Sequence, residues 1–127
     1  MLKMVEMDEN VTLAEQLEEE QKDSGRPVIL INKFNVKPED VDKLLTALAA
    51  EVAYLKQKPG FISTQLHRGI GGSYVFINYA VWESIKYFKH ATTGDPAFRA
   101  ALARYPDSTV GSPHLFRKVA APRICVD

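Results

Sequence analysis

Residues 76–84 read FINYAVWES, and this stretch decides the fold of the chain. Both alternating sets of side chains along it are largely apolar, which predicts a strand that is covered on both faces. Asn78 and Trp82 belong to the same set, four residues apart. Two hydrogen-bonding side chains on one face of an otherwise apolar strand are typical of the wall of a small-molecule pocket.

Segments on both sides of this strand alternate between strand and helix patterns. Residues 28–36 are apolar and rich in β-branched side chains, and Asn32 falls in the same phase as Leu30 and Phe34. The predicted elements are a strand over 28–36, a helix that begins at Pro38 and ends at Pro59-Gly60, strands over 61–68 and up to Trp82 joined by a glycine-rich turn, two helical pieces that begin at Ser84 and Asp95-Pro96, and a strand over 114–121. This β-α-β-β-α-β order predicts an α+β fold, a ferredoxin-like unit with a four-stranded antiparallel sheet.

The chain length of 127 residues indicates one folded domain. We expect this domain over residues 27–121, followed by a C-terminal tail over residues 122–127. Residues 1–26 are acidic and poor in aromatic side chains, so we expect a loosely attached extension there. A capping-box pattern at Thr12 and Glu15 predicts a short helix within this extension.

Composition limits the partners of the protein. Sixteen basic and sixteen acidic side chains cancel, so we expect no surface for nucleic acid or for an anionic membrane. Cys125 is the only cysteine, which excludes a disulfide framework and a cysteine-based zinc site. The N-terminal region has no long apolar run, so we expect neither a secretory signal nor a membrane span, and the predicted location is cytoplasmic.

A homodimer is expected from the strands themselves. The strands over 28–36 and up to Trp82 are apolar in both phases, whereas the helices of a ferredoxin-like unit cover one face of the sheet. A monomer would therefore expose a large apolar face, which soluble monomers avoid. Pairing two sheets face to face removes that exposure.

Motifs for bound cofactors are missing from the sequence. The glycines of the 69–73 turn lie in a predicted hairpin rather than before a helix, so they do not form an anion-binding loop. The three histidines fall in three different predicted elements without the spacing of a metal pair, and no serine or cysteine lies in a nucleophile elbow. We therefore expect no metal and no organic cofactor, and the predicted site is an aromatic pocket with a few polar groups.

The heptapeptide at residues 78–84, Asn-Tyr-Ala-Val-Trp-Glu-Ser, resembles the signature strand of the antibiotic biosynthesis monooxygenase family. The Pro59-Gly60-Phe61 entry to the preceding strand fits the same family, and the resemblance covers about residues 27–120. It implies a dimeric α+β barrel. It also implies a monooxygenase that needs no cofactor and oxidises a planar phenol, quinol or anthrone-like substrate with dioxygen.

Catalytic residues follow from the resemblance position by position. It implies that Asn78 and Trp82 donate hydrogen bonds to substrate oxygens, and that Arg99 stabilises the substrate anion. The tyrosine of the family falls on Phe88, which has no hydroxyl group. His67, at the end of its strand, is therefore the candidate base for the phenolic proton. The residues expected to bind the substrate are Asn32, Phe34, Phe61, Phe76, Tyr87 and Phe88.

Two other functions remain open. The same pocket would serve a non-catalytic dimer that binds a small molecule. Related dimeric barrels degrade haem with an asparagine on the first strand, and Asn32 occupies that position. The histidine of those proteins is replaced here by Ala101 or Leu102, so haem would lack its axial ligand.

Overall fold

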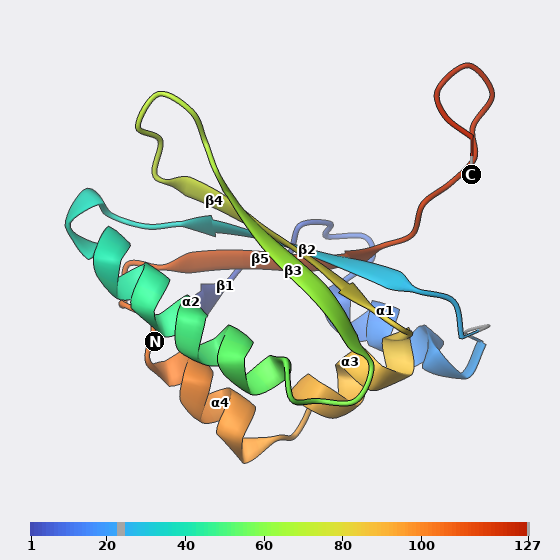
Figure 1. The fold of residues 1–127 in the computed structure, drawn as a ribbon, viewed down its shortest axis with the longest axis horizontal. Helices are drawn as coiled ribbons and strands as arrows, with labels where there is room; N and C mark the ends of the chain where they lie inside the picture. Colours follow the sequence, from blue (N-terminus) through green and yellow to red (C-terminus); the bar gives the residue numbers. More distant parts are fainter. Residues whose placement is uncertain (23–24, 127) are drawn as a thin grey trace.

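Within residues 1–22 and 25–126, which the computed structural model describes, the chain forms a five-stranded sheet and four α-helices (Figure 1). The elements in chain order are β1 Lys3–Met4, α1 Leu13–Leu17, β2 Val28–Asn35, α2 Val41–Leu55, β3 Phe61–Arg68, β4 Val75–Trp82, α3 Ile85–Thr92, α4 Pro96–Ala103 and β5 Val110–Phe116. Short 3-10 helices over Glu18–Lys22 and Pro38–Asp40 follow α1 and precede α2. None of these helices is both long and apolar enough to cross a bilayer.

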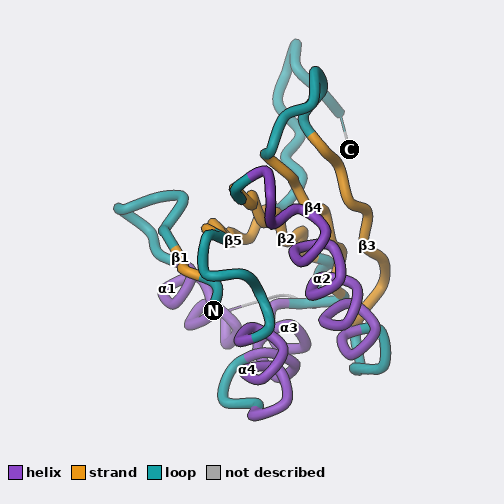
Figure 2. The backbone as a smooth tube through the Cα atoms, turned by 90° about the vertical axis from the view of Figure 1, so that its left-hand side faces the viewer, coloured by secondary structure: helices purple, strands orange, loops and turns teal. Residues whose placement is uncertain are grey.

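The sheet has the strand order β1-β5-β2-β4-β3. Its last four strands pair antiparallel with the connectivity of a ferredoxin-like unit, which confirms the predicted fold class. The predicted count of four strands needs a correction, because β1 adds a short parallel strand beside β5. Figure 2 shows α2, α3 and α4 on the same side of the sheet.

The last strand lies earlier in the chain than its predicted range of 114–121. β5 covers Val110–Phe116 and pairs with β2 along its length. The predicted strand began after Pro113 because proline is unfavourable inside a sheet. In the structure, the backbone N–H of Leu115, two residues later, points to the outer edge of the sheet. The backbone nitrogen of Pro113 faces the same edge. Proline has no N–H, and at this edge no neighbouring strand requires one.

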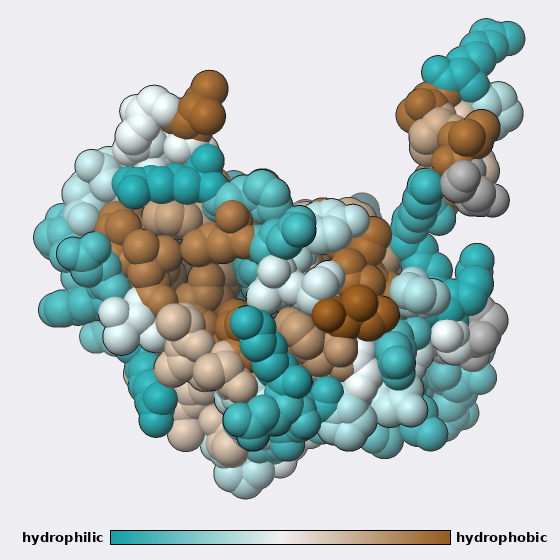
Figure 3. Space-filling view, in the orientation of Figure 1, coloured by the Kyte–Doolittle hydropathy of each residue, from teal (hydrophilic) through white to brown (hydrophobic). Residues whose placement is uncertain are grey.

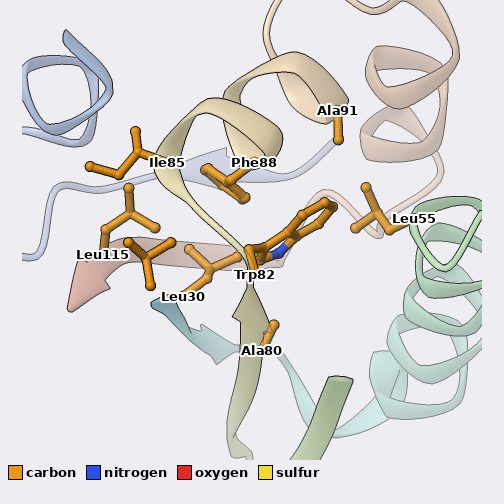
Figure 4. Close-up of a cluster of buried hydrophobic side chains, with 9 residues drawn as sticks. Leu30, Leu55, Ala80, Trp82, Ile85, Phe88, Ala91 and Leu115 are labelled. Carbon is orange, nitrogen blue, oxygen red and sulfur yellow. The ribbon is translucent and has the colours of Figure 1, made fainter. Parts of the chain in front are cut away.

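The core lies between the sheet and the helices. One cluster packs Trp82 and Leu30 of the sheet against Leu55 of α2 and Phe88 of α3 (Figure 4). A second cluster packs the strand residues Phe34 and Phe76 against Leu44, Leu48 and Tyr105. The helix ends carry the expected caps, since Ser84 accepts a hydrogen bond from the backbone N–H of Tyr87 and Asp95 accepts from those of Ala97 and Phe98.

The N-terminal segment is docked on the domain, so the expectation of loose attachment was wrong. Leu2 is buried in the second core cluster. The amide of Gln16 donates to the carbonyl of Leu115 and accepts from its N–H, both at 2.9 Å. The side-chain amide thus satisfies the free edge of β5 as another strand would. The predicted helix start at Thr12 is confirmed, because the backbone N–H of Glu15 donates to Thr12 Oγ1 at 3.2 Å. The Glu15 carboxylate accepts from the Thr12 hydroxyl, so only the N-cap half of the capping box forms.

The C-terminal residues leave the body of the molecule after β5 (Figure 1). Ala121 and Cys125 form an isolated antiparallel bridge there, and the Cys125 thiol is exposed. Asp23, Ser24 and Asp127, which belong to the predicted extension and tail, lie outside the described residues.

Candidate functional site

A cavity of about 190 Å³ lies between the sheet and the helices. Strands β1, β2 and β5 and helices α1 to α4 all contribute to its wall. The wall is apolar apart from two threonines, an asparagine and a glutamate: Met4, Leu13, Leu17, Leu30, Asn32, Glu51, Leu55, Phe88, Thr92, Thr93, Phe98, Leu102 and Pro113. Such a wall suits a flat apolar ligand that carries a small number of polar atoms.

Asn32 is the amide on this wall. The side chain is only 9% exposed, it makes no hydrogen bond within the described residues, and its Oδ1 is fully buried. A buried amide oxygen without a partner is costly, and because Oδ1 is an acceptor, the missing bond would have to come from a donor such as a water molecule. The Nδ2 group of the same amide is left to donate to a ligand. Gly111 on the adjacent strand lies beside this oxygen, since a Cβ there would come within 3.4 Å of Asn32 Oδ1 and 3.1 Å of the Leu2 side chain.

Glu51 is the carboxyl group on the wall. It is 8% exposed and accepts a hydrogen bond of 3.0 Å from the hydroxyl of Tyr105. Burial raises the pKa of Glu51 to about 7, and the hydrogen bond from Tyr105 opposes this rise. The buried carboxyl is therefore able to change its protonation state near neutral pH.

Glu51 is absent from the predicted site residues, although the sequence carries a signal for it. Leu44, Leu48 and Leu55 line the buried side of α2, and Glu51 falls between them at the same helical spacing. A single carboxyl group within an apolar helix stripe is either paired or functional, because burying it alone is costly. The apolar neighbours dominated the pattern, and the glutamate within it was passed over.

Asn78 and Trp82 lie on the helix-covered face, as the strand pattern predicted. Asn78 is the direct cross-strand neighbour of Asn32, and its Oδ1 accepts a hydrogen bond of 2.6 Å from Thr64 Oγ1. Trp82 is fully buried and packs edge-on against Phe88. Both side chains stand next to the cavity wall, and neither contributes to its lining.

Arg99 and His67 lie away from the cavity. Arg99 is exposed on α4. His67 is exposed and pairs with Ile77, on the sheet face opposite to Asn78. Strict alternation along the strand would put His67 on the same face as Phe61, but a bulge between Phe61 and Ser63 shifts the register and puts the two side chains on opposite faces.

The residues expected to bind substrate divide into two groups. Asn32 and Phe88 line the cavity. The other four do not line it. Phe34 and Phe76 belong to the second core cluster, and Phe61 packs against Trp82. Tyr87 packs against Gly60, outside the cavity. Within the described residues, no three histidine, cysteine or carboxylate side chains gather as metal ligands.

Comparison with known proteins gives the family. The sequence model of the antibiotic biosynthesis monooxygenase family matches residues 27–104, more than half of the chain. This chain belongs to that family. Among curated proteins, none matches the sequence closely enough to be counted as a relative.

Solved structures with the same fold include members of this family. A protein of Shewanella loihica PV-4 named "putative monooxygenase" is 33% identical, with a TM-score of 0.64, and the match covers 76% of this chain and 97% of that one. SnoaB of Streptomyces nogalater, a cofactor-independent oxygenase, is 21% identical, with a TM-score of 0.68 and coverage of 77% and 98%. A protein of Caulobacter crescentus CB15 named "putative antibiotic biosynthesis monooxygenase" is 20% identical, with a TM-score of 0.63 and coverage of 80% and 98%.

The family match begins at residue 27, so the docked N-terminal segment lies outside it. Three residues of that segment, Met4, Leu13 and Leu17, nevertheless form part of the cavity wall. In this member of the antibiotic biosynthesis monooxygenase family, the cavity is therefore lined both by the matched region and by residues on either side of it, including Pro113 of β5.

Proposed function

We propose that this protein is a cofactor-independent monooxygenase that oxidises a small phenol of one or two rings with dioxygen. The observation that carries the proposal is the cavity itself, in which the buried residues Asn32 and Glu51 are part of an otherwise largely apolar wall. Membership of the family and the oxygenase SnoaB among similar folds support the reaction type.

Cavity volume supports the size of the substrate. An apolar protein cavity of about 150 Å³ holds a benzene molecule. At about 190 Å³, this cavity fits one ring with substituents or two compact rings. A three-ring anthrone would need the walls to move apart, so the smaller members of the predicted substrate class are favoured.

The proposed reaction balances without a cofactor. A phenol loses its hydroxyl proton and passes electrons from the ring to dioxygen. One oxygen atom bonds to the ring carbon opposite the hydroxyl group in place of the hydrogen on that carbon, and the O–O bond breaks. The other oxygen atom takes this hydrogen and the phenolic proton and leaves as water, so that a phenol and one O₂ give a para-quinone and one H₂O. The protein binds the flat ring, stabilises its anion and excludes bulk water.

Polar side chains near the cavity have separate parts in this proposal. Asn32 donates from its Nδ2 to the substrate oxygen, and its neighbour Asn78 is the second amide on the same face. The donor role of Trp82 stays a prediction drawn from the family resemblance. Arg99 and His67 lie away from the cavity and have no part in this proposal.

Asn32→Ala tests the site. With 1-naphthol as the two-ring probe, we expect wild-type protein to consume dioxygen and form the para-quinone in the presence of chelators. Removing the amide should lower kcat/KM roughly tenfold to a hundredfold, the size expected for one donor to developing charge. An oxygen electrode and quinone absorbance measure both steps.

The control for this variant is Asn35→Ala, which removes an exposed amide from the same strand. It should keep the wild-type rate. If no phenol of one or two rings supports oxygen uptake, the non-catalytic binding protein becomes the better description of the cavity. Equal losses in both variants would show that the amide at position 32 has no special part.

We also propose that the chain forms a homodimer through the helix-free face of the sheet. Ile77 is 39% exposed and Phe116 is 37% exposed on that face. Exposed apolar area of this kind is typical of a subunit interface. Figure 3 shows a separate apolar patch between the β3–β4 hairpin and α2, on the side of the sheet that carries the helices.

Light scattering at micromolar concentration should give about twice the chain mass of 14.2 kDa. Ile77→Lys should shift the mass toward one chain, because the interface would bury an unpaired charge. The control is Ile70→Lys, at a hairpin position that is 97% exposed. A wild-type mass of one chain would contradict the proposal.

A further inference from the structure

We infer that Glu51 is the catalytic base that takes the phenolic proton in this cavity, and that Tyr105 is its positioning residue. The inference rests on the proposed oxygenase function and names the group that performs its first step. Neither the strand signature nor the family resemblance points to these two side chains.

Geometry is the first support. Glu51 and Asn32 come from opposite layers, the helix α2 and the strand β2, and both line the same cavity. A phenol bound between them can receive a hydrogen bond from the Asn32 amide and direct its O–H to the carboxylate of Glu51. The two polar groups on opposite walls thus fix the position of one hydroxyl group.

Tyr105 gives Glu51 a defined orientation. Its hydroxyl donates to one carboxylate oxygen, Glu51 Oε1, and leaves the other oxygen available to accept a proton from the substrate. The Tyr105 ring is itself held by stacking on Phe34, with ring centroids 5.8 Å apart. Packing in the second core cluster therefore holds the Tyr105 hydroxyl in position to donate to Glu51.

No other described group on the wall competes for this role. Tyr105 is the one titratable side chain in contact with Glu51, and burial and the adjacent carboxylate keep its pKa well above the usual range. The remaining wall, from β1, α1, β2, α3, α4 and β5, consists of apolar, threonine and asparagine side chains. His67 faces the opposite side of the sheet.

The raised pKa of Glu51, about 7, suits a base for a phenol. A phenol has an unperturbed pKa near 10, about six units above that of a free glutamate. Raising the glutamate value to about 7 halves this gap, while much of the carboxyl group stays ionised at neutral pH. Glu51 is protonated below pH 7 and ionised above it, so activity should rise with pH through this range. The proton it accepts returns to the departing oxygen to complete the water molecule.

Glu51→Gln tests the base directly, since it keeps the shape of the side chain and removes its basicity. We expect kcat/KM for 1-naphthol to fall at least about a hundredfold, and the rise of activity through pH 7 to disappear. The control is Asp42→Asn, the same change of charge at an exposed position of the same helix. It should keep both the rate and the pH profile.

Tyr105→Phe tests the positioning role. The ring and its stacking remain, and the donor to the carboxylate is lost. Because that hydrogen bond holds the pKa of Glu51 down, we expect the rising limb of the pH profile to move to higher pH. A structural role alone would lower stability without moving the limb.

Binding of 1-naphthol, followed by its fluorescence, separates this inference from the proposed function. An ionised Glu51 accepts a stronger hydrogen bond from the phenol, so the wild-type Kd should tighten several-fold as pH rises through 7, and the Glu51→Gln value should stay constant. If wild-type protein consumes oxygen and the Gln variant keeps its rate and pH profile, Glu51 is not the base. If the wild-type protein consumes no oxygen, and wild type and Glu51→Gln show the same pH dependence of Kd, the oxygenase proposal and the role of Glu51 both fail. If the wild-type protein consumes no oxygen but the pH dependence of Kd differs between wild type and Glu51→Gln, Glu51 is the group that binds the phenol hydroxyl and the oxygenase proposal fails.

Discussion

Trp82→Ala is expected to lower the free energy of unfolding by about 3–5 kcal/mol, the usual cost of removing a large buried ring. The indole is fully buried, and its ring packs edge-on against Phe61 at 5.3 Å and Phe88 at 5.7 Å between centroids. Figure 4 shows it between the sheet and the helices, with Leu55 beside it. Removing the ring leaves a hole at the junction of these layers, and urea unfolding measures the loss.

The control is Ile70→Ala, which removes a large apolar side chain that is 97% exposed. It should change the free energy of unfolding by less than about 0.5 kcal/mol. Trp82→Phe keeps most of the ring and should cost less stability than the alanine variant. If it folds well and loses turnover by tenfold or more, the donor role predicted for the indole is supported. A Trp82→Ala variant as stable as wild type would contradict the packing described here.

Deleting residues 1–22 is expected to cost roughly 3 kcal/mol or more, because a fully buried leucine contributes about 1.5–3 kcal/mol and Leu2, Leu13 and Leu17 all pack on the core. For a domain of this size, the Tm should fall by roughly 10 °C or more. The deletion also removes Met4, Leu13 and Leu17 from the cavity wall. The affinity for 1-naphthol should therefore fall at least about tenfold. Calorimetry and fluorescence titration measure the two effects.

A matched truncation removes residues 119–127, whose described part leaves the body of the molecule (Figure 1). Val119 and Ile124 are 67% and 82% exposed, so their loss should leave the Tm nearly unchanged. A shortened protein without residues 1–22 that keeps both its Tm and its affinity would show that the N-terminal segment is dispensable to the core and to the cavity.

Local patterns along the chain predicted most of the fold. The alternation in residues 76–84 predicted β4, and the structure confirms Asn78 and Trp82 on one face. Proline and capping signals at Ser84 and Asp95-Pro96 predicted the starts of α3 and α4. These features depend on neighbours within a few residues, where propensity, capping and side-chain period act directly.

The docking of the N-terminal segment could not be predicted in the same way. Its composition is acidic and it has no aromatic residue, which is typical of a loose extension. Its attachment depends on partners distant in the chain, such as the Leu115 backbone for Gln16 and Lys89 for Glu20. The outer edge of β5 and the surface of α3 present these partners only when the domain has folded.

The sequence by itself determined the order of the elements, the side-chain faces of the central strands and the family, because each depends on local pattern or on a continuous motif. Only the tertiary structure decided which polar groups share a cavity. A bulge after Phe61 puts His67 on the opposite face, and the packing of α2 on the sheet brings Glu51 to the cavity that Asn32 lines. Contacts between residues far apart in the sequence depend on strand register and on how the helices pack on the sheet. The packing of the whole core sets both, and no single segment determines them.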